Sequence, residues 1–139
     1  MANVTRHLPR IDDDSRPYWE SARAHAVQMQ KCDDCGKFRF YPSPACHFCG
    51  SLAFTWTPIS GKGEIYTYSI LERAKGNSFA DLVPIAIVMV TLDEGPVMMA
   101  DLVDYEPGSI HIGQRVEMTY EDVTDEVTLP MFRPAPEAR

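Results

Sequence analysis

The four cysteines of the chain lie close together, in two C-x-x-C-G pairs that start at Cys32 and Cys46. A C-x-x-C turn directs two sulfur ligands at one point, and the glycine after it lets the backbone fold back tightly. With ten residues between Cys35 and Cys46, two such knuckles predict a closed zinc ribbon with no coordination position left for water or substrate. The predicted ligands of a structural Zn²⁺ are Cys32, Cys35, Cys46 and Cys49.

Other uses of these cysteines remain open from the residues alone. Two disulfides are the general alternative for four cysteines, but the chain opens without an apolar signal segment, which favours a reducing compartment. Iron is the closer rival, because rubredoxin-type sites use the same paired knuckles. His47 lies inside the second knuckle, yet four thiolates already complete a tetrahedral site, so we expect a solvated loop histidine.

Composition is that of an ordinary globular protein, with 45% hydrophobic and 24% charged residues in 139. The longest apolar run, 82–90, is far shorter than the roughly 20 residues that span a bilayer, so we expect a cytoplasmic protein with no membrane partner. Charge is uneven: residues 1–60 hold seven basic and six acidic residues, whereas residues 61–139 hold six and fourteen. The second half therefore carries a net charge of −8.

One helix is expected ahead of the cysteines, from about Arg16 to Met29. Asp14 or Ser15 can cap it, and Pro17 in the first turn lacks only an N–H that would have no partner there. An apolar stripe follows at helical spacing, with Tyr18 beside it. The stripe can pack in the chain's own core or contact a partner protein, and both remain open; its members are Trp19, Ala22, Ala26 and Met29.

Large apolar residues, four of them aromatic, alternate along the strands of the predicted ribbon, and we expect them to shield the thiolates from water; they are Phe38, Phe40, Leu52, Phe54 and Trp56. The segment 58–63 is the predicted hinge to a second unit whose pattern is entirely β. Five strands with a tight turn at Asp93–Gly95 and a long connection over 104–113 are typical of an OB-fold barrel. The strands are expected at Glu64–Arg73, Pro84–Leu92, Pro96–Val103, Arg115–Glu121 and Glu126–Phe132.

The predicted architecture is thus mostly β: an N-terminal arm and helix over 1–30, a rubredoxin-like zinc ribbon over 31–60 and a five-stranded OB-fold over 61–139. The sequence contains no G-x-S-x-G, H-E-x-x-H or P-loop motif. We therefore predict no catalytic residues of its own. An OB-fold beside a zinc ribbon also permits nucleic-acid binding, but that needs a basic groove, and this barrel is strongly acidic.

Beyond the cysteine quartet, the chain carries a set of short motifs along nearly its whole length, and together they resemble a known bacterial and archaeal family. This is the family of zinc-ribbon/OB-fold proteins associated with acyl-CoA enzymes. The motifs are Pro17-Tyr18-Trp19, Tyr41-Pro42, Cys49-Gly50-Ser51, Trp56, Ser60-Gly61-x-Gly63, Pro84, Leu92-Asp93-x-Gly95, Ile112-Gly113-x-x-Val116 and Pro130-x-Phe132-x-Pro134.

The resemblance implies a non-catalytic accessory subunit in a hetero-oligomer with a thiolase-fold enzyme, either a thiolase or a retro-aldolase. Some relatives instead accompany hydratases. It implies structural zinc, docking through the helix and ribbon with Tyr18 and Trp19 as interface residues, and a barrel that helps form the acyl-CoA entrance. For that entrance the sequence offers the loop with Arg73, Lys75 and Phe79, which can equally be an ordinary mobile loop.

Two features limit this picture. Many relatives have Pro-Pro-Arg before the second knuckle, whereas this chain has Pro42-Ser43-Pro44, so a contact made by that arginine is in doubt here. The acidic barrel repels the phosphates of coenzyme A, so we expect the partner or the first unit to supply most phosphate contacts. An iron-containing electron carrier and an OB-fold nucleic-acid-binding module are the rival functions.

Overall fold

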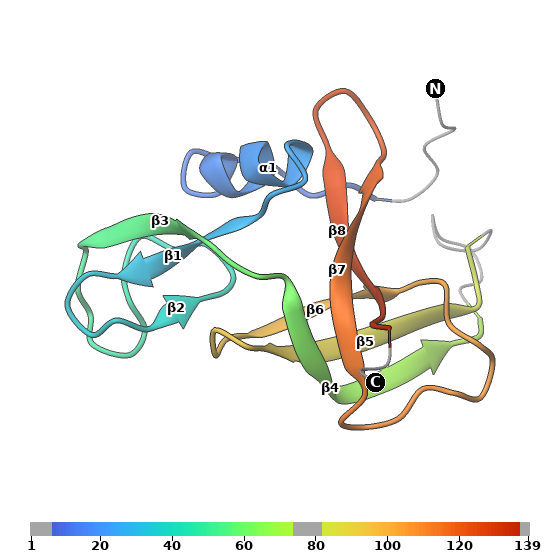
Figure 1. Cartoon of the computed structure of the whole chain (residues 1–139). Coiled ribbons are helices and arrows are strands. Elements are labelled where there is room, and N and C mark those ends of the chain that lie inside the picture. Colours follow the sequence, from blue (N-terminus) through green and yellow to red (C-terminus); the bar gives the residue numbers. More distant parts are fainter. Residues whose placement is uncertain (1–6, 74–81, 137–139) are drawn as a thin grey trace.

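The helix is short and lies across the top of the molecule in the computed structural model, which describes residues 7–73 and 82–136 (Figure 1). Helix α1 spans Arg16–Arg23, with Ser15 at its N-cap and a proline in its first turn. Ser15 and Asp12 exchange hydrogen bonds: the Ser15 N–H donates to the Asp12 carboxylate, and the Asp12 N–H donates to the Ser15 hydroxyl. The predicted start of the helix is therefore confirmed.

The predicted helix end at Met29 is wrong. The chain leaves the helix after Arg23, and His25 takes a left-handed conformation with φ of 58°. Met29 lies instead in strand β1 (Gln28–Cys32), where it pairs with Thr57. The apolar spacing suggested a longer helix because Met29 is buried in both arrangements, whereas Ala26, which the longer helix would bury, is exposed.

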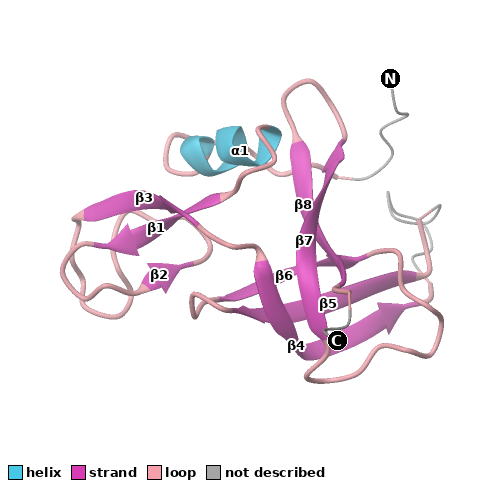
Figure 2. Cartoon of the chain, viewed as in Figure 1, coloured by secondary structure: helices cyan, strands magenta, loops and turns pink. Residues whose placement is uncertain are grey.

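Three short strands form the ribbon sheet in the order β2-β1-β3, drawn as magenta arrows on the left of Figure 2. Strand β2 spans Phe38–Arg39, and β3 spans Phe54–Pro58. The β1–β3 pair runs antiparallel from Gln28 opposite Pro58 to Cys32 opposite Phe54. This register places the first metal-binding knuckle directly after the paired end of β1.

The second unit is a closed barrel in the order β4-β5-β6-β8-β7, with β7 pairing back onto β4. Its third and fifth strands run parallel where Leu102 meets Phe132, and this order is the topology of an OB-fold. The predicted five-stranded OB-fold is therefore confirmed, and every strand end lies within two residues of its prediction. The strands are β4 (Lys62–Leu71), β5 (Ile85–Leu92), β6 (Val97–Leu102), β7 (Arg115–Asp122) and β8 (Thr128–Pro134).

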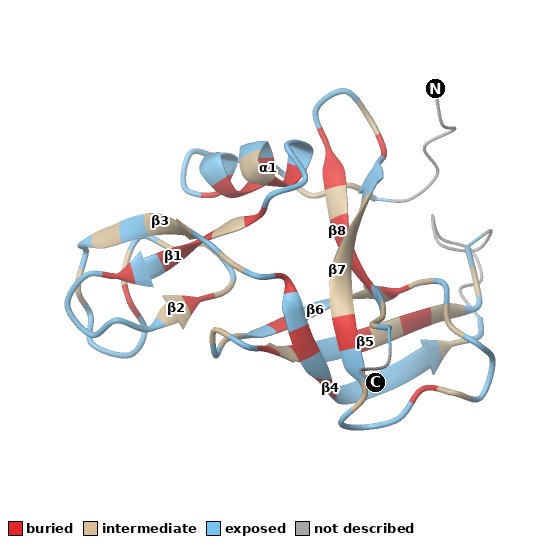
Figure 3. Cartoon of the chain, viewed as in Figure 1, coloured by how far each residue is buried: buried red, intermediate tan, exposed pale blue. Residues whose placement is uncertain are grey.

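A single apolar core joins the helix to the barrel. Tyr18, Trp19 and Met29 belong to the same buried cluster as the inward-facing residues of the barrel strands, and red segments of α1, β1 and β8 face one another in Figure 3. The helix is thus attached to the chain's own barrel as well as to the ribbon. In the described part of the chain, no helix has the length and hydrophobicity needed to cross a membrane.

Candidate metal centre and adjoining surfaces

The four cysteine sulfurs converge at one end of the ribbon, all within 4.8 Å of one another. The Sγ atoms of Cys32 and Cys49 are 3.6 Å apart, and those of Cys35 and Cys46 are 3.7 Å apart. Four ligands at the usual Zn–S distance of about 2.3 Å define a tetrahedron with edges of about 3.8 Å. The donor set therefore fits a tetrahedral thiophilic metal ion. All four cysteines are free, so the structure holds no disulfide between them.

Each knuckle is shaped by backbone geometry that its glycine provides. Gly36 and Gly50 have φ of 77° and 78°, and an added Cβ would meet nothing within 4 Å at either position. The need for glycine is therefore conformational and not a matter of space. Backbone N–H groups also point at the sulfurs, since Phe48 N lies 3.4 Å from the Sγ of Cys46. Such contacts favour the thiolate form that a metal requires.

Without a cation the crowded thiols cannot all ionise. Burial opposes ionisation of Cys46, but backbone N–H groups, that of Phe48 foremost, and neighbouring thiols outweigh it and lower its pKa to about 6. At Cys49 the N–H of Ser51 favours the thiolate, whereas the other cysteine thiols and burial raise the pKa to about 12. A divalent cation removes this conflict because it neutralises the charge that the four thiolates share.

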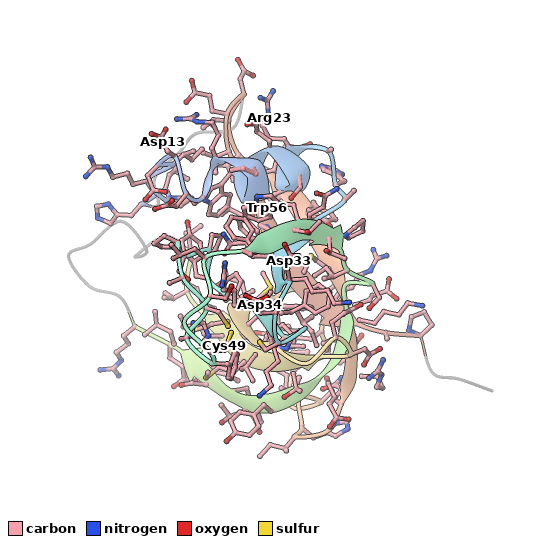
Figure 4. All side chains as sticks on the ribbon, turned by 90° about the vertical axis from the view of Figure 1, so that its left-hand side faces the viewer. Asp13, Arg23, Asp33, Asp34, Cys49 and Trp56 are labelled. Atoms are coloured by element: carbon pink, nitrogen blue, oxygen red, sulfur yellow. The ribbon has the colours of Figure 1, made fainter. Side chains whose placement is uncertain are left out.

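Side chains of the first knuckle fasten it to the segment that enters β3. The Thr55 hydroxyl donates a 2.7 Å hydrogen bond to Asp33, and the Ser51 hydroxyl donates to Asp34. Figure 4 shows both aspartates near Cys49 at the end of the ribbon below β3. Sequence reasoning did not single out these acids, because adjacent aspartates on a metal-binding turn normally indicate only solvation.

The expected aromatic cover of the metal site is partly wrong. Leu52 is 73% exposed, whereas Phe54 and Trp56 are half-buried and meet edge to face. On β2 the fully buried side chain is that of Arg39, while Phe38 beside it is half-buried.

Arg39 is the most unexpected residue of the ribbon. Its Nε donates a 3.0 Å hydrogen bond to the Gln30 side-chain oxygen, which also accepts the N–H of Ser43 at 2.9 Å. The guanidinium lies 4.9 Å from the Phe54 ring centroid, and its two terminal nitrogens are buried with no hydrogen-bond partner among the described residues. No sequence signal predicts a buried arginine here, because alternation with two phenylalanines places it outside.

The predicted interface residues lie in the protein's interior. Tyr18 is 2% exposed and Trp19 is 7% exposed, and the Trp19 indole N–H donates a 2.9 Å hydrogen bond to the Tyr41 hydroxyl. Burial raises the pKa of Tyr18. Of the predicted entrance residues, Arg73 is exposed after the end of β4, whereas Lys75 and Phe79 lie outside the described residues. The roles proposed for these residues remain predictions.

Both aromatic rings line an apolar pocket that the sequence did not reveal. It has a volume of about 360 Å³ and lies between the helix and ribbon on one side and strands β4, β5, β6 and β8 on the other. Two larger hollows, of about 870 and 950 Å³, have several charged residues in their walls. The apolar pocket is lined by Tyr18, Trp19, Phe40, Tyr41, Leu71, Ile85, Ile87, Met98, Met99, Ala100, Asp101, Leu129, Pro130 and Met131.

Comparison with protein families divides the chain into two matched regions. Residues 19–55 match the model described as "ChsH2, rubredoxin-like zinc ribbon domain", and residues 56–121 match "ChsH2, C-terminal OB-fold domain". Four cysteines positioned to bind a metal therefore lie in a zinc-ribbon domain. The boundaries predicted at 30/31 and 60/61 remain predictions.

Relatives of known designation include subunits and scaffolds. A "Probable enoyl-CoA hydratase alpha subunit" of Thermomonospora curvata is 32% identical over 94% of this chain, although the chain spans only 40% of that relative's length. A "DUF35 domain-containing scaffold protein" of Methanothermobacter thermautotrophicus is 37% identical over 69% of the chain and 72% of the relative. Among solved structures, a chain of "Ltp2-ChsH2(DUF35) aldolase" superposes with a TM-score of 0.81 and 31% identity, covering 93% of this chain and all of the other.

Proposed function

Since the chain belongs to the DUF35 family, in which a ChsH2-type zinc ribbon precedes an OB-fold, we propose that it is a non-catalytic accessory subunit of an acyl-CoA-processing enzyme. The enzyme partner that we propose has the thiolase fold, as the sequence resemblance implies. The subunit docks on this partner in a hetero-oligomer and helps to form the entrance to its acyl-CoA site.

One observation carries this proposal: the likeness to a chain of the Ltp2-ChsH2(DUF35) aldolase extends over that chain's full length. The superposition covers all of that related chain, so the two chains share its fold from end to end, and this supports a similar role as a subunit. The scaffold designation of the archaeal relatives supports the same conclusion.

The metal that we propose is structural zinc, bound by Cys32, Cys35, Cys46 and Cys49. Four thiolates complete a tetrahedral shell, so zinc bound there supplies folding energy and holds the two knuckles together. The protein's own residues do the rest: the aspartates of the first knuckle tie it to the entry of β3, and the glycine turns orient the sulfurs. An iron site of the rubredoxin kind is the alternative that metal analysis decides.

A hydratase is the second candidate partner, and a specific observation favours it. Two relatives are designated alpha subunits of acyl-CoA hydratases, but this chain spans 40% and 37% of their lengths. Nucleic-acid binding lacks comparable support, because two of the four basic residues in the described barrel are engaged in ion pairs with Asp93 and Glu117.

Co-expression tests the proposal directly. The chain is produced together with the thiolase-fold protein encoded nearest to it, and the two are separated by size-exclusion chromatography. We expect co-elution, one zinc per chain by elemental analysis, and acyl-CoA turnover by the enzyme that falls when the accessory chain is withheld. Separate elution with undiminished enzyme activity would exclude the thiolase-fold partner, and a parallel trial with an acyl-CoA hydratase subunit tests the second candidate.

A further inference from the structure

The apolar pocket continues onto an exposed apolar surface of the barrel. Met99 in the pocket wall is 61% exposed, and it pairs directly with Met89 on the neighbouring strand. Side chains of directly paired residues project from the same face of a sheet, and Val97, two residues along β6, projects from that face too. Both Met89 and Val97 are exposed. Tyr41 extends this surface on the ribbon side of the pocket, where its ring is also exposed.

We define this docking surface as the pocket together with Tyr41, Met89, Val97 and Met99. Apolar surface of this kind is costly to hydrate, and contiguous patches beside a concave pocket mark sites of protein contact. Exposed methionines adapt their unbranched side chains to the shape of a partner. The aromatic wall behind them is held in place by the Trp19–Tyr41 hydrogen bond. An inserted side chain would pack against this wall in one position.

The charge around the pocket favours a basic protein partner over a coenzyme A thioester. The described barrel residues, 62–73 and 82–136, carry four basic and twelve acidic side chains. Asp101 lines the pocket itself. Among the described residues, Glu72 and Arg73 directly follow β4 and Asp104 closely follows β6, and strand pairing puts these two strand ends at the same end of the barrel. Acidic side chains around the pocket repel the phosphates of a coenzyme A thioester and attract the lysine and arginine side chains of a partner protein.

We infer that this docking surface receives the partner enzyme subunit, which inserts an apolar side chain into the pocket and sets basic residues against the acidic barrel end. The inference rests on the proposed function and adds to it which surface is used and what chemistry the partner presents. It also assigns a role to the predicted interface residues, since Tyr18 and Trp19 form the wall against which the inserted side chain packs.

The substitution Met99→Glu tests the inference, with Ile112→Glu as the matched control. Ile112 is 68% exposed, lies in the connection before β7 and does not line the pocket. Because both side chains are mostly exposed, both variants should fold, which circular dichroism checks. Titration calorimetry against the purified thiolase-fold subunit should show at least a tenfold loss of affinity for Met99→Glu and an unchanged affinity for Ile112→Glu. Wild-type affinity should also fall as salt is raised from 50 to 500 mM.

Each contrary result has a distinct meaning. If wild type binds and Met99→Glu binds equally well, the docking surface is wrong and the proposed function stands; if wild type does not bind, the proposed function and this inference both fail. Concentration-dependent dimers of the isolated chain that Met99→Glu abolishes would show that a second copy covers the surface. Quenching of tryptophan fluorescence by decanoyl-CoA in a Trp56→Phe background, where Trp19 is the remaining tryptophan, would instead make the pocket an acyl site. Affinity that rises with salt would contradict the basic partner.

Discussion

The ribbon and the barrel bury very different amounts of side chain, although they belong to one short chain. Between residues 33 and 58 the buried residues are Arg39 and Cys46. In the barrel, by contrast, Val88 and Val90 on β5 and Val116 on β7 are wholly buried. The barrel therefore has an ordinary hydrophobic core of its own, whereas the ribbon has almost none.

This difference indicates two sources of stability. Zinc bound by a four-thiolate site contributes on the order of 10–16 kcal/mol of apparent binding free energy, while a whole domain is stable by about 5–15 kcal/mol. Strand β1 buries Met29, Gln30 and Cys32, but the rest of the ribbon buries only Arg39 and Cys46. The ribbon beyond β1 therefore depends on the metal, and a barrel with a closed core does not. Large apolar residues such as Phe48 can therefore stay exposed on the ribbon, because the metal and not a hydrophobic core stabilises it.

Removing one ligand should separate the two regions most clearly. We expect metal removal by a chelator to unfold the ribbon and leave the barrel folded. We expect the same from Cys46→Ser, because this variant should lose most of the free energy of metal binding. Elemental analysis measures the metal, and amide resonances in ¹H–¹⁵N spectra report each region. His47→Ala, in the same knuckle but exposed, should retain a full complement of metal. Simultaneous loss of the barrel resonances would refute the division.

The converse substitution weakens the barrel and spares the ribbon. Phe132 is fully buried and pairs with Leu102 where β8 meets β6. Its replacement by alanine should cost about 3–5 kcal/mol of unfolding free energy, because transfer and cavity terms add. Denaturant titration measures the loss, and the metal content at low denaturant should stay at one per chain. A proportional loss of metal would show that the ribbon needs the barrel core in order to form.

Local patterns predicted the parts of the molecule that local physics determines. Paired cysteines with following glycines require a knuckle wherever they occur, so the metal site followed from spacing alone. The nearly continuous apolar run in Ile85–Leu92 predicted a strand, and the structure buries every second side chain along it. The turn at Gly95, which has φ of 117°, was visible because glycine occupies such conformations freely.

Long-range packing decided the features that the sequence did not reveal. The helix ends early because β1 must pair with β3, a contact between segments that are far apart in the chain. Arg39 is buried because Gln30, opposite it in register, supplies an acceptor. The apolar pocket needs residues from the helix, the ribbon and four barrel strands at once, and no window of sequence contains all of them.

The buried polar pair offers a smaller test of how the ribbon is held. Gln30→Leu removes the acceptor that Arg39 and the Ser43 amide share and leaves both donors buried without a partner. Each unsatisfied buried donor should lower the free energy of unfolding by about 1–3 kcal/mol, and a charged donor by more. Arg39→Met combined with Gln30→Leu should be less destabilising than Gln30→Leu alone, because no charge is then left unpaired. Denaturant titration of the metal-loaded chains measures this coupling. Strictly additive losses would show that the two side chains act separately.

The weakest effect concerns the ion pair that joins the segment after the helix to the barrel. His25, after the helix, lies 2.8 Å from the Asp122 carboxylate on β7, which also accepts a 2.7 Å hydrogen bond from Thr128. The His25 contact and then that of Thr128 hold the pKa of Asp122 below its ordinary value of 3.8. A carboxyl with a lowered folded-state pKa adds stability above its unfolded-state pKa and loses it as the pH falls through the folded value.

Asp122→Asn should therefore lower the melting temperature slightly at pH 7, and the difference from wild type should narrow below about pH 4. The side chains of His25 and Asp122 are 46% and 63% exposed, so water and salt screen the pair and the effect is small. Melting curves of both proteins at pH 7 and pH 2.5, in low and high salt, measure it. A difference that persists unchanged at pH 2.5 would mean that Asp122 joins helix and barrel through packing and not through its charge.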